Sequence, residues 1–287
     1  MYAASSPSDP LIAPGAARAD GAVRVSFDRA HGRTRLAGLY QRAPMRVLLP
    51  KPAPDDLALA ALVNVGGGLV AGDRARVEVR VGEGAAVLVT GQAAEKVYRS
   101  TAADTAVENR LAVAPGAWLE WCPQETILFD RARLRRSLRL DLEGDARAML
   151  GEMLVLGRHA SGERARQGLL HDMIEVRRDG ALVWQDRLRL AGDYARLRDA
   201  PAGLNGARAL ATFVYAGPNA ERWLDLAREQ LTTHPVPAGA TMVDGLLIAR
   251  WLGSDALALR RSFAQFWGWF RAAVAGLPPA PPRLWHV

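Results

Sequence analysis

Apolar and polar residues alternate over most of the first 190 residues, and this period of two constrains the fold more than any other feature of the chain. The segment RVEVRV (76–81), for example, leads through GEG to AAVLVTG (85–91). Because successive side chains of a β-strand point to opposite faces, the alternation predicts half-buried strands joined by short turns. Asp179-Gly180 predicts a tight hairpin. At least eight strands between about 21 and 190 indicate a mainly β protein, an extended stack of antiparallel strands.

The period changes to that of a helix after about residue 217. Segment 218–232 predicts an amphipathic helix with Asn219 as its N-cap, and its apolar stripe is Trp223, Leu224, Ala227 and Leu231. A second helix is expected to start at Ser254, its candidate N-cap, and to end at Gly276 and the prolines that follow. Its apolar face is Leu259, Phe263, Phe266, Trp267, Phe270 and Val274. Both C-terminal α-helices should pack on the sheet.

The domain boundaries follow from composition. Residues 1–20 are rich in small residues and proline and are expected to form a flexible tail, and 21–287 to form a single domain with an irregular connection at 191–210. The tail lacks the pattern of a signal peptide, and the most apolar stretch, 57–72, is too interrupted to span a membrane. With a single cysteine, Cys122, the chain fits a reducing compartment. We therefore expect a cytoplasmic protein.

The basic residues are unusual, since 35 of the 37 are arginines and the net charge is +7. The arginines are scattered among 30 acidic residues, which argues against a nucleic-acid-binding module. Their densest cluster is RARLRRSLR, in which Arg131, Arg133 and Arg135 have the spacing of one strand face. This face is either simply solvated or a docking site for an acidic partner.

The usual catalytic patterns are absent from the sequence. Gly66, Gly68 and Ala71 match a dinucleotide-binding spacing, but a strand follows where that motif requires a helix. The five histidines are isolated from one another, so no tightly bound transition metal is expected. We therefore expect no enzymatic activity.

Glu152 is the most informative carboxylate. It lies in AMLGEMLVLGR, where both faces of the predicted strand are apolar. A buried carboxylate needs a proton, an arginine, several hydrogen-bond donors or a cation. Arg158 is about 20 Å away along a strand and cannot be its local partner. Two interpretations stay open: an ion pair with a distant arginine, or the polar lining of a path or interface.

Five segments in order along the chain resemble the UreD (UreH) family of urease accessory proteins. They are GGLVAGD (67–73), QAAEKVYRS (92–100), LEWCPQETILFD (119–130), GEMLVLGRHASGE (151–163) and the terminal PRLWHV (282–287). The chain departs from that family at three positions. Ala71 stands where Gly is common, Gly66 lies in a segment that is often Pro-rich or Ala-containing, and Glu95 stands where a small hydroxyl residue is usual. The resemblance implies a β-helix-like stack of strands with two C-terminal helices.

The resemblance also implies a function. It points to a non-catalytic scaffold that binds apo-urease and, with UreF and the GTPase UreG, assists nickel insertion, with nickel in transit and no bound cofactor. By that implication a polar internal path for nickel is lined or shaped by Asp73, Glu125, Asp130, Glu152 and Glu163. Well-separated oxygen ligands would hold nickel weakly, as transit requires. The alternatives are a stand-alone metal-dependent enzyme and a basic nucleic-acid-binding module.

Overall fold

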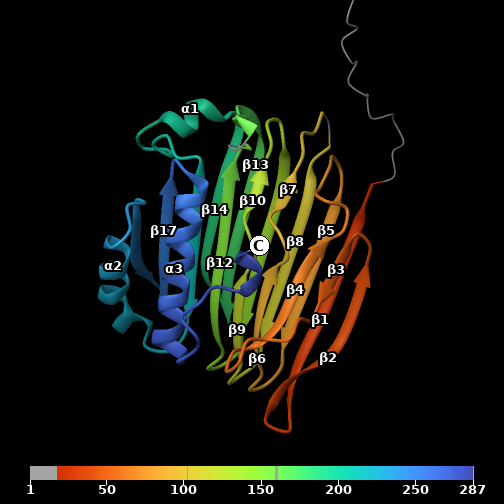
Figure 1. Cartoon of the computed structure of the whole chain (residues 1–287), viewed down its shortest axis with the longest axis vertical. Coiled ribbons are helices and arrows are strands. Elements are labelled where there is room, and N and C mark those ends of the chain that lie inside the picture. The colour runs from red at the N-terminus through yellow and green to blue at the C-terminus, as the bar shows by residue number, and fades with distance from the viewer. Residues whose placement is uncertain (1–17, 102, 159–160, 287) are drawn as a thin grey trace, which may run out of the picture.

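The chain forms two packed β-sheets with helices on one side (Figure 1). The structure is a computed structural model, and it describes residues 18–101, 103–158 and 161–286. Residues 1–17 of the expected tail lie outside this range, and the first strand begins at Asp20. The mainly β stack with C-terminal helices is confirmed.

The first sheet has seven strands. Their order is β14 (Ala181–Asp193), β13 (Gln167–Arg178), β11 (Arg133–Leu142), β8 (Thr105–Val113), β5 (Arg74–Val81), β1 (Asp20–Ala30) and β2 (Arg33–Arg42). The second sheet has ten strands. Eight follow the order β16 (Ala238–Val243), β17 (Leu246–Gly253), β15 (Ala209–Ala216), β12 (Arg147–Leu156), β9 (Trp118–Cys122), β6 (Ala86–Gly91), β4 (Ala58–Asn64) and β3 (Met45–Leu48), while β10 (Thr126–Leu128) pairs with β12 and with β7 (Glu95–Val97).

Strand direction is mixed, which corrects the expectation of an antiparallel stack. Neighbouring strands in the middle of each sheet run parallel, as β5, β8, β11 and β13 do in the first and β4, β6, β9 and β12 in the second. Antiparallel pairs lie toward the edges, including the β13–β14 hairpin, which turns at Asp179-Gly180 as predicted. The turns after β5, β8 and β11 carry the chain across to the other sheet. Each passage therefore returns in the same direction, and the chain winds as a β-solenoid.

Three glycines form the corners of this winding. Gly84, Gly116 and Gly144 follow β5, β8 and β11, and their φ angles of 62°, 67° and 52° lie in the left-handed region that glycine adopts without steric cost. Consecutive corners are hydrogen-bonded, since the Gly84 amide donates to the Pro115 carbonyl at 3.1 Å. These glycines therefore set the places where the chain leaves one sheet for the other.

The helices lie on the outer side of the ten-stranded sheet. They are the 3-10 turn η2 (Ala220–Trp223), α2 (Leu224–Thr232) and α3 (Ala256–Ala275). The short helix α1 (Tyr194–Asp199) lies within the connection 191–210 that was expected to be irregular, and the 3-10 turn η3 (Arg283–His286) ends the described chain. The N-cap of α3 is Asp255 and not Ser254, because the Asp255 carboxylate accepts from the Ala258 amide at 2.7 Å. Asn219 precedes η2 in a left-handed conformation and makes no side-chain cap hydrogen bond. In the described part of the chain, no helix combines the length and hydropathy needed to cross a bilayer.

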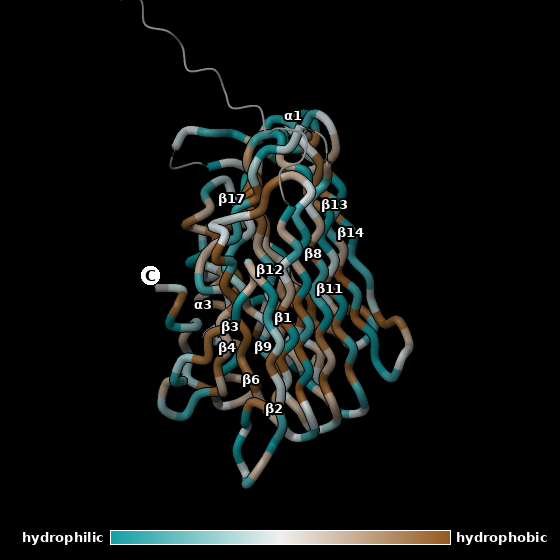
Figure 2. Tube along the Cα trace, turned by 90° about the vertical axis from the view of Figure 1, so that its right-hand side faces the viewer, coloured by the Kyte–Doolittle hydropathy of each residue, from teal (hydrophilic) through white to brown (hydrophobic). Residues whose placement is uncertain are grey.

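Two hydrophobic cores result from this layering. One lies between the sheets and contains the inward residues of the alternating strands, such as Val25, Val79 and Leu140; Figure 2 shows apolar and polar residues alternating along these strands. The other lies between the ten-stranded sheet and α3, where Phe213 contacts Phe266 and Phe270 with ring centroids 5.2 and 5.0 Å apart. The aromatic stripe of α3 is therefore core, as predicted.

A buried arginine holds α3 and the C-terminal segment on the sheet. Arg271 is 1% exposed, and its Nε lies 3.1 Å from Glu120 Oε2 on β9. Its other nitrogens donate to Asp56 and to the carbonyls of Pro278 and Ala280. This contact joins residues far apart in the chain.

Candidate functional site

Two cavities lie within the β stack on opposite sides of one group of charged side chains. The first measures about 220 Å³ and includes Asn64, Glu95 and Gln124 in its lining; the second measures about 270 Å³ and includes Asp186 and Arg250. The two linings share only Arg136 and Glu152. Those two side chains therefore form a common wall between the cavities.

The shared wall is part of a cluster of three buried charges. Arg136 on β11 donates to Glu152 Oε2 on β12 at 2.5 Å, and it binds Asp172 on β13 through two parallel hydrogen bonds of 2.7 and 2.6 Å. The three residues are 6%, 5% and 7% exposed. Trp121 Nε1 donates to Glu152 Oε1 at 2.7 Å. Glu152 thus has the distant arginine partner that its apolar surroundings require.

The charges of this cluster do not cancel. One guanidinium faces two carboxylates, so the cluster carries an excess of one negative charge when both carboxylates are ionised. Burial raises the pKa of Glu152, and the nearby Asp172 adds to the rise, although Arg136 opposes it. For Arg136 the two carboxylates outweigh burial and raise the pKa, so the guanidinium stays charged. Such a site stabilises an additional proton or a cation.

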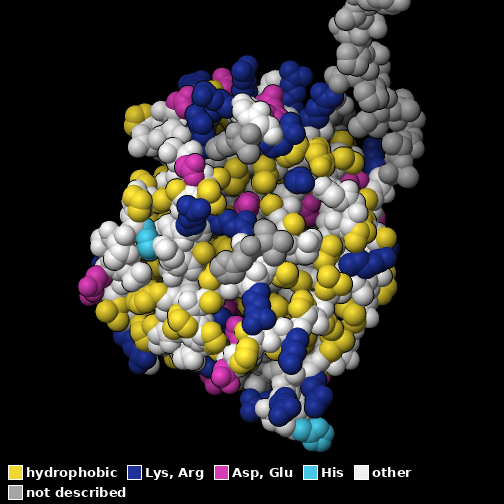
Figure 3. Space-filling model, in the orientation of Figure 1, with side chains coloured by type: hydrophobic (Ala, Val, Ile, Leu, Met, Phe, Trp, Pro, Cys, Tyr) yellow, Lys and Arg dark blue, Asp and Glu magenta, His cyan; other side chains and the backbone are white. Residues whose placement is uncertain are grey.

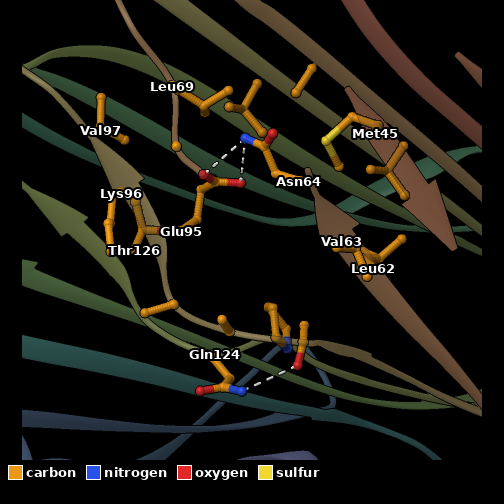
Figure 4. Close-up of a pocket in the computed structure, with 18 of the residues that line it drawn as sticks. Met45, Leu62, Val63, Asn64, Leu69, Glu95, Lys96, Val97, Gln124 and Thr126 are labelled. Atoms are coloured by element: carbon orange, nitrogen blue, oxygen red, sulfur yellow. Dashed lines mark hydrogen bonds between the residues drawn. The ribbon is translucent and has the colours of Figure 1, made fainter. Parts of the chain in front are cut away.

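Glu95 and Asn64 form a second polar feature, in the first cavity. Figure 4 shows the two side chains facing each other across the cavity lining, and Asn64 Nδ2 lies 3.1 and 3.3 Å from the two oxygens of Glu95. Burial raises the pKa of Glu95 to about 7, although the hydrogen bond from Asn64 and the nearby Lys96 oppose the rise. Glu95 therefore exchanges its proton near neutral pH.

The other expected path carboxylates lie outside both linings. Asp73 is buried, and it accepts from the Ala19 amide at 2.8 Å and the Val70 amide at 2.9 Å, which closes the glycine-containing loop. Glu125 forms an ion pair with Arg260 of α3 at 2.8 Å. Both have structural partners, and neither faces a cavity.

Asp130 and Glu163 come together at one end of the stack. Asp130 accepts from the Arg166 and Gln167 amides, while Glu163 accepts from the Asp130 amide at 3.2 Å and pairs with Arg158 at 2.5 Å. Of the five expected carboxylates, Glu152 alone lines either of these two cavities.

The expected basic strand face is only partly formed. Arg131 precedes β11 in a turn with φ of 64°, so it does not share the face of Arg133 and Arg135. These two arginines both bind the carboxylate of Asp104, at 2.6 and 2.5 Å. The three arginines therefore do not form one strand face, and their role in docking stays a prediction.

Sequence reasoning missed Arg136, Asp172 and Glu95. The first two carried a signal, because each is a charged residue at an inward position of an alternating strand: Arg136 lies between Leu134 and Leu138 in the inward row of β11. Glu95 carried a weaker signal: it departs from the small hydroxyl residue usual in the resembled family, but β7 has only three residues, too few for alternation to show which way its side chain points.

No residue set in the described chain resembles a metal-storage site. Among residues 18–101, 103–158 and 161–286, no three side chains of His, Cys, Asp or Glu come close enough to hold a metal ion. Any cation here would be bound by few protein ligands.

The fold and its cavities define a β-solenoid protein with a negatively charged cluster enclosed between its sheets. A family model described as UreD urease accessory protein matches residues 19–286. The chain is 46% identical over 272 residues to urease accessory protein UreD of Magnetococcus marinus, covering 93% of the chain and 94% of the relative. It is 42% identical over 286 residues to the protein of that name from Xanthobacter autotrophicus, covering 98% and 96%. The chain belongs to the UreD family of urease accessory proteins.

Proposed function

We propose that the protein is a non-catalytic scaffold in urease maturation, which binds apo-urease and acts with UreF and the GTPase UreG in nickel insertion. Family membership supports the role in urease maturation. The observation that carries the nickel path is the pair of cavities that meet at Glu152 and Arg136. The path runs through the interior of the stack, with nickel as its cargo.

The buried cluster suits transit of a divalent cation. Its excess negative charge attracts Ni²⁺, while Arg136 occupies one oxygen of Glu152 and Trp121 the other. Nickel that binds Glu152 Oε2 competes with the Arg136 nitrogen there, and an Arg136 displaced from Glu152 stays bound to Asp172. This competition keeps the affinity for nickel low, as passage requires.

A stand-alone enzyme is the second candidate, because Glu95 in a cavity with a pKa of about 7 is the type of group that serves as a general base. A hydrolase would also need a nucleophile or a metal. The described lining of this cavity includes no Ser, Cys or His side chain, and its one hydroxyl, that of Thr126, accepts a hydrogen bond from Arg136 at 3.2 Å. The scaffold role is therefore favoured, and the pure protein is expected to turn over neither urea nor GTP. Turnover of either one would overturn this assignment.

The decisive experiment is activation of apo-urease by the complex across a nickel titration. Glu152→Gln keeps the side-chain volume and is expected to fold and to co-purify with UreF and apo-urease, yet to activate urease less at limiting nickel. Glu229→Gln, on the exposed face of α2, is the matched control and should activate like the wild type. Full activation by Glu152→Gln at every nickel level would remove Glu152 from the path.

A further inference from the structure

The outer face of the seven-stranded sheet carries a large part of the arginine excess. Strand register places Arg74, Arg135, His171 and Arg189 in one row across β5, β11, β13 and β14. Arg80 and Arg187 point outward from the same sheet. We call this surface the basic sheet face.

Several of these arginines have no acidic partner. Within the described residues, no carboxylate lies within 4 Å of Arg74, Arg80, Arg187 or Arg189. Acidic residues do occur on the face, but Glu78 lies opposite Arg24 and Arg110, and Glu175 lies opposite Arg139. The face is therefore a mosaic of both signs with positive charge in excess.

The fold leaves this face open. Helices α2 and α3 pack on the ten-stranded sheet, on the other side of the molecule (Figures 1 and 2). The side seen in Figure 3 has a different character, with hydrophobic side chains scattered over it and basic ones gathered near α1 and toward the opposite end of the molecule. Six strands from β1 to β14 span about 24 Å, and the rows extend about 20 Å along them. That footprint of about 480 Å² is somewhat more than half of the roughly 800 Å² that each partner buries in a standard interface.

The chemistry of the face selects one class of partner. Single-stranded nucleic acids bind to basic grooves with exposed aromatic rings, whereas the only large exposed aromatic residue in the described chain is Tyr40, and Arg24 covers its ring at 4.6 Å. The acidic residues within the mosaic would repel the phosphates of a duplex. A second copy would bring arginines against arginines, which is unfavourable. A protein surface with acidic residues in excess complements the pattern.

We infer that the basic sheet face docks an acidic protein surface during urease maturation, which places one partner on the side of the molecule opposite α3. This inference rests on the proposed function, because apo-urease and UreF are the probes that test it. Electrostatic complementarity of this kind sets association rate and specificity, and it weakens with salt.

The test is the affinity of the full chain for purified apo-urease and UreF, measured by biolayer interferometry at low and high salt. The variant Arg80→Glu/Arg189→Glu reverses two arginines at opposite sides of the face. The matched control, Arg222→Glu/Arg261→Glu, makes the same charge change on the helical side, where both arginines are exposed. We expect the first variant to lose about tenfold or more in affinity for one partner, and the control to stay near the wild type.

Two outcomes would overturn the inference while the proposed function stands. In the first, the reversal variant binds both partners as tightly as the wild type does. In the second, the wild type binds a 20-base-pair DNA duplex more tightly than it binds either partner at physiological salt. Failure of the wild type to bind either protein would instead refute the proposed function, and the inference with it. If the charge reversal prevents folding, as judged by near-UV circular dichroism, Arg80→Gln/Arg189→Gln is expected to show the same loss in smaller measure.

Discussion

Glu152 has two roles at the residue scale, because it is both half of a buried ion pair and part of the wall of two cavities. Asp172 allows the two roles to be tested separately. When the charge of Glu152 is removed, Arg136 keeps its two hydrogen bonds to Asp172 and is not left unpaired. The sequence alone could not show this, as it offered only the choice between an ion pair and a path.

Arg136→Met should therefore destabilise the protein more than Glu152→Gln does. The first change leaves two buried carboxylates without a cation and should lower the free energy of unfolding by about 3–5 kcal/mol. The second leaves Arg136 bound to Asp172 and should cost about 1–3 kcal/mol. Urea unfolding of both variants measures the difference, and equal losses would contradict the role assigned to Asp172.

Glu95 should make stability depend on pH. Its pKa is about 7 in the folded chain, against 4.5 for a glutamate side chain in water, so the folded state holds the proton more tightly. Stability is therefore highest below about pH 4.5 with respect to this group, falls as the pH rises to about 7 and stays lower above it. Between pH 5 and pH 8 the loss should be about 2–3 kcal/mol.

Glu95→Gln is expected to remove this loss, whereas Glu83→Gln, in an exposed turn, should follow the wild type. The measurement is the urea midpoint of all three proteins at both pH values. Identical pH profiles for wild type and Glu95→Gln would show that Glu95 does not titrate in this range.

At the scale of elements, α3 closes the second core with one aromatic face, which packs on the strands of the ten-stranded sheet. Phe266 is fully buried against Phe213, Trp251 and Phe270. Phe266→Ala should cost about 3–5 kcal/mol, because it removes a large apolar side chain and leaves a cavity. Its exposed neighbour provides the control: Gln265→Ala should change stability by less than about 0.5 kcal/mol. The measurement is the melting temperature of both variants in thermal unfolding. Similar melting temperatures would argue against a packed α3.

At the scale of the whole molecule, the end of the stack formed by β2 and β3 exposes apolar side chains. Leu36, Leu39 and Tyr40 on β2 are 42%, 41% and 43% exposed, and Leu48 on β3 is 54% exposed. Strand edges with exposed apolar residues favour association. We expect the isolated chain to aggregate unless UreF is present, as measured by size-exclusion chromatography with light scattering. A monodisperse monomer at high concentration, unchanged by UreF, would count against this expectation.

The sequence by itself determined the local features of this protein. Period-two alternation gave the strands, the change of period gave the C-terminal helices, and Asp179-Gly180 gave the hairpin, because each depends on side chains within a few residues of one another. Tertiary structure alone decided which strands became neighbours. A turn after β5 looks much the same in sequence whether the chain folds back beside β5 or crosses to the other sheet, so the parallel solenoid was not predictable from alternation. For the same reason the sequence did not identify the other charges of the cluster around Glu152. Arg136 and Asp172 lie sixteen and twenty residues away from Glu152, and only the winding of the chain brings the three side chains together.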